Sequence, residues 1–422
     1  MVLILLMLPL VQQWKHPFAE PAIGGVVVDA PKPEFSSENI LNGSFQTSTT
    51  EYLKDVVGFR SLFVGINNDM QYRLFHHIPS EGVVKGRDGF LFETGYVDSY
   101  MGKDFLGSSA IRKKLDKVLF LQDTLKSMGI DLILVFAPNK ARCYSDHLPG
   151  YPEIHPGRSN YDEYIKQSKQ LGIPFIDING WFMEAKDTSR YPLITRLGTH
   201  WDSYGMVLAM DSIASYLEKS QGIDLPEILI DTLIMRDSTH PLEYDLARLL
   251  NLLLPLSQSP APVPVYHFST TGKTKPRVLA IADSYYSFVY TGPLASGLFS
   301  EPHYWYYFKG LFSPGKDKLP TEKVDLMDEI RNQDVIIIMA TESNLFNFGW
   351  GFIEKAFSSF KGIAYQNALN EKRVREFEQL IRANPKWLEQ VKLKAEQRNV
   401  SLDSMIRLDA LYMTEREQII NQ

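Results

Sequence analysis

Cysteine is almost absent from this sequence of 422 residues, and Cys143 is the only one. A single cysteine excludes a disulfide within the chain and a cysteine-rich metal site. It does not decide the cellular compartment, because an exported bacterial protein without disulfides has the same composition. We expect no metal and no cofactor.

The sequence also lacks an excess of charge of one sign. Its 44 Lys and Arg and 50 Asp and Glu give a net charge of −6, and the two signs are interspersed along the chain. No basic patch indicates nucleic acid as a partner. The length suffices for one large or two ordinary domains with a sizeable core.

No apolar run is long enough to cross a bilayer. Residues 1–11 are almost entirely apolar, but this run is short and lacks the positively charged start of a signal peptide. A buried core helix is one interpretation. The terminal position and the following Gln12-Gln13-Trp14-Lys15 instead favour the outer part of a signal anchor. We therefore predict an apolar membrane anchor over residues 1–13 and leave open whether the anchor begins before Met1. We expect the anchor to be retained because no convincing cleavage site follows.

Apolar strands and amphipathic helices alternate in the middle of the chain. Short apolar runs at 130–136, 173–178, 278–282 and 334–340 predict buried strands, and helical patterns lie between them. This alternation predicts an α/β fold with a parallel sheet flanked by helices. The predicted segments are the anchor (1–13), a linker with amphipathic helices (14–78), the α/β domain (79–364) and a helical appendage (365–422).

Ser284 follows the predicted strand Val278–Ala282 directly after Asp283. A serine at the carboxyl end of a sheet strand lies where ligands bind in open α/β sheets, and a helix start there offers N–H groups to an oxyanion. Asp283 or Ser284 could instead serve only as a helix cap.

His200 precedes a predicted helix at 206–216, so it too is expected at a loop tip. A serine nucleophile needs a base to accept its proton, and histidine is the usual one. Most of the nine histidines must be packed or surface residues, so the combination with Ser284 carries the hypothesis.

Five motifs in order resemble the SGNH-hydrolase-like domain of alginate-type polysaccharide O-acetyltransferases, the AlgJ/AlgX group. They are Lys85–Phe92 (the GKDGWLF-type hairpin), Ala137-Pro138-Asn139-Lys140, Tyr144–Pro149, Thr199-His200-Trp201 and Ala282–Tyr286. Histidine precedes serine, as in that group and unlike ordinary GDSL esterases. The resemblance covers residues 83–362.

The resemblance implies a membrane-anchored, extracytoplasmic protein of bacterial polysaccharide O-acetylation. A membrane-bound O-acyltransferase partner in the inner membrane would supply the acetyl group. Ser284 would form the acyl-enzyme with His200 as base, and a hydroxyl of the polysaccharide would then attack. An acetylesterase would pass the same acyl group to water.

The sequence departs from the family at one important position. The family usually has Asp-x-His-Trp, with the aspartate orienting the histidine, and here that position is Gly198. A backbone carbonyl, Asp202 or Glu342 could take over this role, although Asp202 is also a good helix N-cap. Gly198 favours a second class of function, a catalytically silent glycan-binding or scaffold subunit.

Further polar and aromatic residues are candidates for the same site. Asn139 is a candidate oxyanion donor or a simple turn residue, and Asp283 is a candidate for an oxyanion or orienting role. Lys140 could bind an acidic sugar or pair with a neighbour. Trp201, Tyr285 and Tyr286 are candidate sugar contacts within an aromatic-rich region, although aromatic side chains mostly pack in cores.

Overall fold

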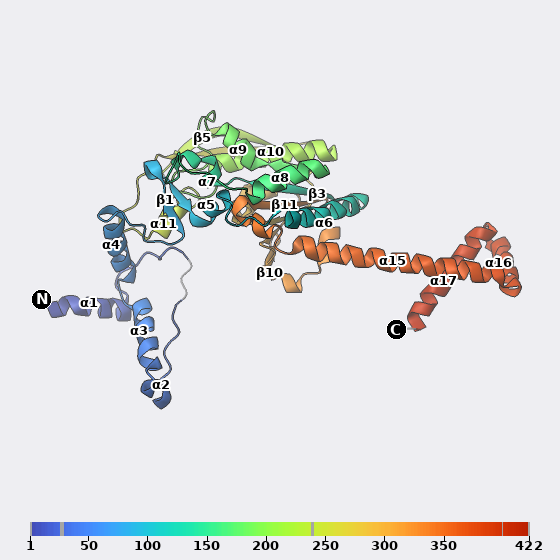
Figure 1. The fold of residues 1–422 in the computed structure, drawn as a ribbon, viewed down its shortest axis with the longest axis horizontal. Helices are drawn as coiled ribbons and strands as arrows, with labels where there is room; N and C mark the ends of the chain where they lie inside the picture. The colour runs from blue at the N-terminus through green and yellow to red at the C-terminus, as the bar shows by residue number, and fades with distance from the viewer. Residues whose placement is uncertain (1, 26–28, 238–239, 399, 421–422) are drawn as a thin grey trace.

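The computed structural model describes residues 2–25, 29–237, 240–398 and 400–420. Met1 of the predicted anchor and residues 26–28, 238–239, 399 and 421–422 of the other predicted segments lie outside this description. The centre of the molecule is a seven-stranded sheet with the order β10-β9-β8-β7-β11-β3-β4 (Figure 1). Its strands are β3 (Asp131–Ala137), β4 (Phe175–Asp177), β7 (Val278–Ala282), β8 (Pro302–Tyr306), β9 (Gly310–Phe312), β10 (Leu319–Pro320) and β11 (Val335–Thr341).

Five of these strands run parallel, from β8 through β7, β11 and β3 to β4, while β9 and β10 are antiparallel at one edge. Every residue of β7 and β11 is buried, as expected for apolar runs in a sheet covered on both faces. The predicted α/β fold with a mostly parallel sheet is confirmed. The register aligns the carboxyl ends of β3, β11 and β7, so Ala137, Thr341 and Ala282 lie at the same edge.

Helices cover both faces of the sheet. One face packs against residues of α5 (Thr94–Tyr100), α9 (Ile178–Ala185), α10 (Ser203–Gln221), α12 (Ser287–Thr291) and α13 (Pro293–Leu298). The other packs against α6 (Ser108–Ser127), α8 (Asn160–Leu171), α14 (Leu326–Arg331) and the first turns of α15 (Phe352–Ala383). The predicted hairpin is also present, as β1 (Val83–Lys85) and β2 (Leu91–Glu93), and the short helix α7 (Lys140–Cys143) follows β3.

An insertion between α10 and β7 forms a separate two-stranded antiparallel sheet. It contains β5 (Glu227–Arg236), α11 (Asp245–Leu249) and β6 (Ala261–Ser269). The connection from β5 to β6 folds back toward the hairpin, where Tyr244, Leu246 and Leu250 share a core cluster with Val83 and Leu91. The start of α11 is thereby fixed against the central domain.

The N-terminal segment contains four helices that lie to one side of the sheet (Figure 1). They are α1 (Val2–Lys15), α2 (Ser37–Leu41), α3 (Ser44–Val56) and α4 (Arg60–Arg73). The sequence predicted amphipathic helices within residues 14–78, and α2, α3 and α4 lie in this segment. None of the described helices is both long enough and apolar enough to cross a membrane.

The C-terminal segment is helical, as predicted. α15 continues from the central domain without a break across residue 364, where the sequence predicted a boundary, and it carries α16 (Pro385–Arg398) and α17 (Leu402–Ile420) at its far end (Figure 1). These helices have a core of their own, which includes Phe377, Ile381, Val391 and Ile406. We call this group of helices, residues 371–420, the distal bundle.

Candidate active site

Ser284, His200 and Asp245 form a continuous chain of hydrogen bonds at the carboxyl edge of the sheet. The Oγ of Ser284 lies 2.9 Å from Nε2 of His200, and Nδ1 of His200 lies 2.5 Å from Oδ2 of Asp245. The predicted juxtaposition of Ser284 and His200 is confirmed. This is the arrangement in which a base activates a serine and a carboxylate orients the base.

Ser284 is held at the end of β7 by its neighbour Asp283. The buried Asp283 carboxylate accepts hydrogen bonds from the backbone N–H of Tyr285 and from Thr341 (N–H and hydroxyl) and Asn344. Burial raises the pKa of Asp283, and these hydrogen bonds oppose that rise. Asp283 therefore caps the turn that presents Ser284 and links it to β11, and none of its described hydrogen bonds reaches the histidine ring.

His200 is oriented from two sides. Burial acts to lower its pKa, but the hydrogen bond and charge of Asp245, with further contributions from Asp283 and Glu93, raise it above the ordinary value. Asp245 also accepts the N–H of Thr199 through Oδ1 at 2.7 Å, and the Tyr285 hydroxyl donates to the Thr199 carbonyl at 2.7 Å. The loop carrying His200 is thus fixed to both α11 and the serine turn.

Asp245 was not predicted from the sequence. It is the first residue of α11, inside the insertion, and nothing in its neighbourhood distinguishes it from an ordinary residue of a first helical turn. Gly198, where the family motif has aspartate, leaves no space for a side chain. A Cβ there would lie 2.8 Å from Oγ1 of Thr195 and 3.0 Å from the carbonyl of Leu242. The orienting carboxylate has moved from the histidine loop to the insertion.

Asp202 and Glu342, the predicted orienting carboxylates, have other partners. Oδ1 of Asp202 caps α10 by accepting the N–H of Gly205 at 2.7 Å, and burial raises the pKa of this carboxyl to about 8. Glu342 is 1% exposed and pairs with the Arg142 guanidinium at 2.5 Å and 2.8 Å. The expectation that either residue orients His200 is therefore wrong, because Asp245 occupies Nδ1.

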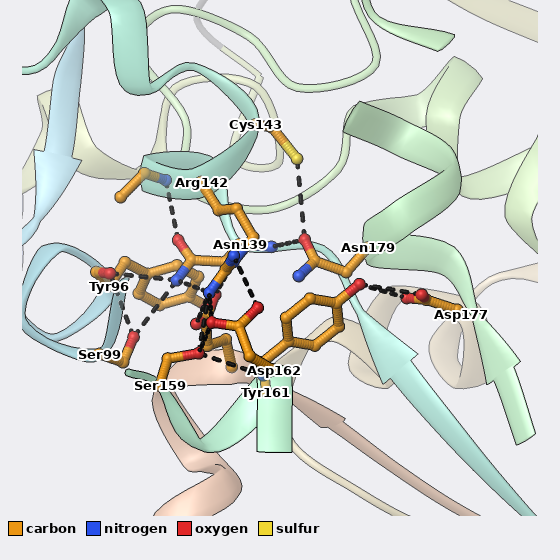
Figure 2. A network of polar contacts seen from close by, with 12 residues as sticks. Tyr96, Ser99, Asn139, Arg142, Cys143, Ser159, Tyr161, Asp162, Asp177 and Asn179 are labelled. Carbon is orange, nitrogen blue, oxygen red and sulfur yellow. Dashed lines mark hydrogen bonds and ion pairs between the residues drawn. The ribbon is translucent and has the colours of Figure 1, made fainter. Parts of the chain in front are cut away.

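Asn139 belongs to a buried polar network (Figure 2). Its side-chain nitrogen faces the Tyr96 carbonyl, the Ser99 hydroxyl and Glu342 at 3.1–3.2 Å, and its oxygen caps α7 at the Ala141 N–H. With its amide engaged in this way, Asn139 has no free donor for an oxyanion. The network instead ties the end of β3 to α5 and to the segment after β11.

Lys140 is fully buried, and its ammonium group supports the histidine loop. Nζ donates to the carbonyls of Arg196 at 2.8 Å and Gly198 at 2.5 Å, and it lies over the rings of Phe90 and Phe92. Burial lowers the pKa of Lys140 to about 7, and Asp245 partly opposes this shift. The predicted contact with an acidic sugar does not agree with this burial, and the alternative of a neighbouring partner is the one observed.

The aromatic candidates also pack in the core. Trp201, Tyr285 and Tyr286 are each 0% exposed. The Tyr285 ring lies 4.8 Å from the His200 ring and 5.1 Å from Trp201. Tyr285 and Trp201 pack behind His200, whereas Tyr286 packs against Tyr304. Because all three are buried, the direct contact with a sugar that was predicted for them is not possible without rearrangement.

Two further side chains near Ser284 and His200 were missed. The pKa of Tyr307 is raised to about 12 by burial and by Asp283, although the hydroxyl and N–H of Ser284 act on it in the opposite direction. Tyr307 follows β8 with a φ of 48°, an uncommon backbone conformation for a tyrosine that is typical of functional sites. Glu93 at the end of β2 is a second acidic group near His200, and burial raises its pKa.

The fold is an α/β domain, and the carboxyl edge of its sheet presents a hydrogen-bonded serine, histidine and aspartate in the arrangement of a catalytic triad. Residues 83–283 match the family described as "SGNH hydrolase-like domain, acetyltransferase AlgX". The matched segment includes His200 and Asp245 and ends one residue before Ser284. The predicted resemblance is confirmed for this domain.

AlgJ proteins are distant relatives of the chain. It is 24% identical over 202 residues to a probable alginate O-acetylase AlgJ of Pseudomonas aeruginosa, covering 48% of this chain and 49% of the relative. The corresponding protein of Pseudomonas putida is 25% identical over 180 residues, with 43% and 45% covered. The chain thus spans about half the length of these relatives.

Three solved structures align with the chain at low similarity. The O-acetyltransferase domain of Pseudomonas putida AlgJ aligns with a TM-score of 0.42 and 17% identity, covering 66% of this chain and 99% of that one. Pseudomonas aeruginosa AlgX aligns with a TM-score of 0.41 and 14% identity, with 64% and 67% covered. Bacillus cereus PatB1 aligns with a TM-score of 0.40 and 13% identity, with 64% and 99% covered.

Proposed function

We propose that this protein is an O-acetyltransferase that acts on an extracytoplasmic bacterial polysaccharide through an acetylated Ser284. The observation that carries the proposal is the hydrogen-bonded chain Ser284–His200–Asp245. The relationship to AlgJ proteins, which bear the name probable alginate O-acetylase, supports the acetyl group and the polysaccharide as reactants.

In the first half of the reaction, His200 accepts the Ser284 proton while Oγ attacks the acetyl carbonyl of the donor. The donor's leaving group departs with the proton that His200 returns to it, and an acetyl ester remains on Ser284. In the second half, His200 takes the proton of a sugar hydroxyl, whose oxygen attacks the ester and releases Ser284. Asp245 stabilises the imidazolium that forms in both halves.

The developing oxyanion needs hydrogen-bond donors close to Ser284. Asn139 is engaged elsewhere, so we assign this role to the Ser284 N–H and the Tyr307 phenol. Tyr307 is held beside the serine turn, because its N–H donates to the Ala282 carbonyl at 3.0 Å. Its phenol is protonated at neutral pH, and burial raises its pKa further to about 12.

The acetyl donor would be a membrane-bound O-acyltransferase partner, with this protein held at the inner membrane through its N-terminal apolar segment. An acetylesterase that passes the acetyl group to water uses the same triad. The reason for a catalytically silent scaffold was Gly198, and the Asp245 carboxylate removes that reason.

The test is direct acetylation of Ser284. The full chain is incubated with p-nitrophenyl acetate, and its intact mass and product release are followed. We expect an acetyl adduct or turnover that Ser284→Ala and His200→Ala abolish. Ser287→Ala is the matched control, because its hydroxyl contacts Tyr304 outside the triad, and it should react like the wild type.

The contrary result is equally definite. A folded wild-type protein that forms no acetyl adduct and shows no turnover would refute the proposal that the protein is an enzyme. In cells, polysaccharide acetylation that survives Ser284→Ala but is lost on deletion of the gene would establish a scaffold instead.

A further inference from the structure

A cleft of about 750 Å³ lies beside the triad and has one wall formed by the N-terminal segment. His200, Asp245 and Phe288 belong to one side of this cleft. The other side includes residues 21–25, which we call the strap, and Leu62 and Gly65 of α4. The strap, which precedes His200 by more than 170 positions in the sequence, therefore forms one wall of a cleft whose other wall includes the catalytic base.

The strap is attached to the insertion by a reciprocal pair of hydrogen bonds. The Gly24 N–H donates to Oδ1 of Asn251 at 2.6 Å, and Nδ2 of Asn251 donates to the Gly24 carbonyl at 3.2 Å. A Cβ at position 24 would lie 2.6 Å from the Arg248 carbonyl, so only glycine allows this approach. The strap therefore makes a specific contact with Asn251, which belongs to the same insertion as Asp245.

The position of the cleft relative to the triad indicates which reactant it holds. It is lined by His200 and Asp245, whereas Ser284 is not among its lining residues. In an acyl transfer, the alcohol must approach the histidine to give up its proton, while the acyl group and its oxyanion lie on the opposite side of the serine. The cleft is therefore on the histidine side of the site, where the donor's leaving group departs in the first half of the reaction and the acceptor alcohol enters in the second.

The lining is mainly aliphatic and aromatic. Apart from His200 and Asp245, the only charged side chain among its described residues is Arg248. The apolar contacts come from Ile23, Leu62, Leu249, Leu252, Leu253 and Phe288. Such a surface packs against the C–H faces of sugar rings and offers little to compensate the desolvation of a series of carboxylates.

Building on the proposed function, we propose that the strap and α4 form the acceptor-binding wall and that the cleft takes an uncharged sugar chain. Ile23, Leu62 and Phe288 are then residues that determine acceptor specificity. They act on the transfer step, and the formation of acetyl-Ser284 from a small donor does not require them.

The experiment separates the two half-reactions in the full chain. The burst of p-nitrophenol and the acetyl adduct report acylation. The acceleration of steady-state turnover by an added acceptor reports transfer. The probes are cellopentaose, which is neutral, and the corresponding pentamer of β-1,4-linked glucuronate, which has the same backbone with a carboxylate on each ring.

We expect cellopentaose to accelerate turnover of the wild type and the glucuronate pentamer to do so much less. Ile23→Asp should raise the acceptor KM by about ten-fold or more, the order expected when an apolar contact in a pocket is lost, with an unchanged burst. Ile23→Ala should produce a smaller change in the same direction, and it guards against misfolding of the aspartate variant. Ile40→Asp is the matched control, because Ile40 lies in α2, also in the N-terminal segment, and does not line the cleft.

Several results would overturn the proposal. They are an unchanged acceptor KM in Ile23→Asp and Ile23→Ala, equal acceleration by both pentamers, no acceleration by either, or a burst that falls together with transfer. A wild type without any burst would instead refute the proposed function, on which this inference rests. The two failures are therefore distinguishable.

Discussion

Replacement of Asp245 by asparagine tests the triad most directly, because the structure dictates how the new side chain must lie. Oδ1 of Asp245 accepts two backbone N–H groups, from Thr199 at 2.7 Å and Leu246 at 2.8 Å. An amide nitrogen cannot replace this acceptor, so the nitrogen of the introduced amide has to occupy the position of Oδ2, facing Nδ1 of His200. It then donates to Nδ1, which forces the proton of the neutral ring onto Nε2.

With its proton on Nε2, His200 cannot accept the proton of Ser284. The corresponding change in a well-studied serine protease lowers kcat by about 10⁴-fold, which corresponds to about 5 kcal/mol of transition-state stabilisation. We expect Asp245→Asn to slow acetylation of Ser284 by p-nitrophenyl acetate by a similar factor while the protein remains folded. Stopped-flow product release and time-resolved intact mass would measure it.

The pH profile gives an independent measure of the same interaction. His200 acts as a base only when it is neutral, so wild-type acylation should rise as pH increases through the raised pKa of this ring. Loss of the Asp245 charge removes the main cause of the rise, so the residual activity of Asp245→Asn should appear at lower pH. Asp231→Asn is the control, because Asp231 contacts His267 at 3.0 Å in a similar but exposed pair on the β5–β6 sheet, outside the triad. A rate within ten-fold of the wild type, or an unshifted profile, would refute the reasoning.

Three further substitutions test the supporting structure. Gly198→Asp, which would restore the family motif, should lower the free energy of unfolding by about 1–3 kcal/mol through overpacking and should not raise acetylation. Denaturant unfolding measures the first effect and the burst assay the second. A faster burst would contradict the prediction. Lys140→Met should destabilise the fold by leaving two buried carbonyls without a donor. The folded pKa of Lys140 is about 7 and the unfolded value is near 10.4, so the unfolded chain binds an extra proton between these pH values. Wild-type stability should therefore rise with pH in this range relative to Lys140→Met. Parallel curves in pH-dependent unfolding would argue against the lowered pKa of Lys140. Tyr307→Phe should slow acylation by about 10²-fold or more with unchanged stability if its phenol donates to the oxyanion, and an unchanged burst would remove it from the site.

The sequence predicted those parts of the site that depend on local pattern. Short apolar runs identified the parallel strands, and polar residues immediately after them placed Ser284 at the edge where such strands end. His200 was singled out because it precedes a predicted helix and because a serine nucleophile such as Ser284 needs a base. The motifs around both residues were specific enough to indicate the domain class that the comparison confirms.

The remainder depends on contacts between distant parts of the chain. Asp245 reaches His200 only because the insertion folds back onto the β1–β2 hairpin. The pattern of apolar residues along the sequence does not indicate this long-range contact. Asn139 and Glu342 are 203 positions apart yet share a hydrogen bond, which removes both from the roles predicted for them. Lys140 and Trp201 were candidates for sugar contacts because of the motifs in which they lie, and only the packing shows that both side chains are fully buried.

The helix α15 joins the α/β domain to the distal bundle without a loop over its 32 residues. An α-helix advances about 1.5 Å and turns about 100° with each residue, so α15 is about 48 Å long and fixes both the separation and the rotational setting of the bundle. Removing one residue from its exposed middle would leave the separation almost unchanged but turn the bundle by about 100°. Removing about 11 residues, or about three turns, from the part of α15 between the core residues Phe360 and Val374 would nearly restore the rotational setting and shorten the separation by about 16 Å. Deletions of these two lengths therefore distinguish a requirement for reach from a requirement for facing direction in whatever the bundle contacts.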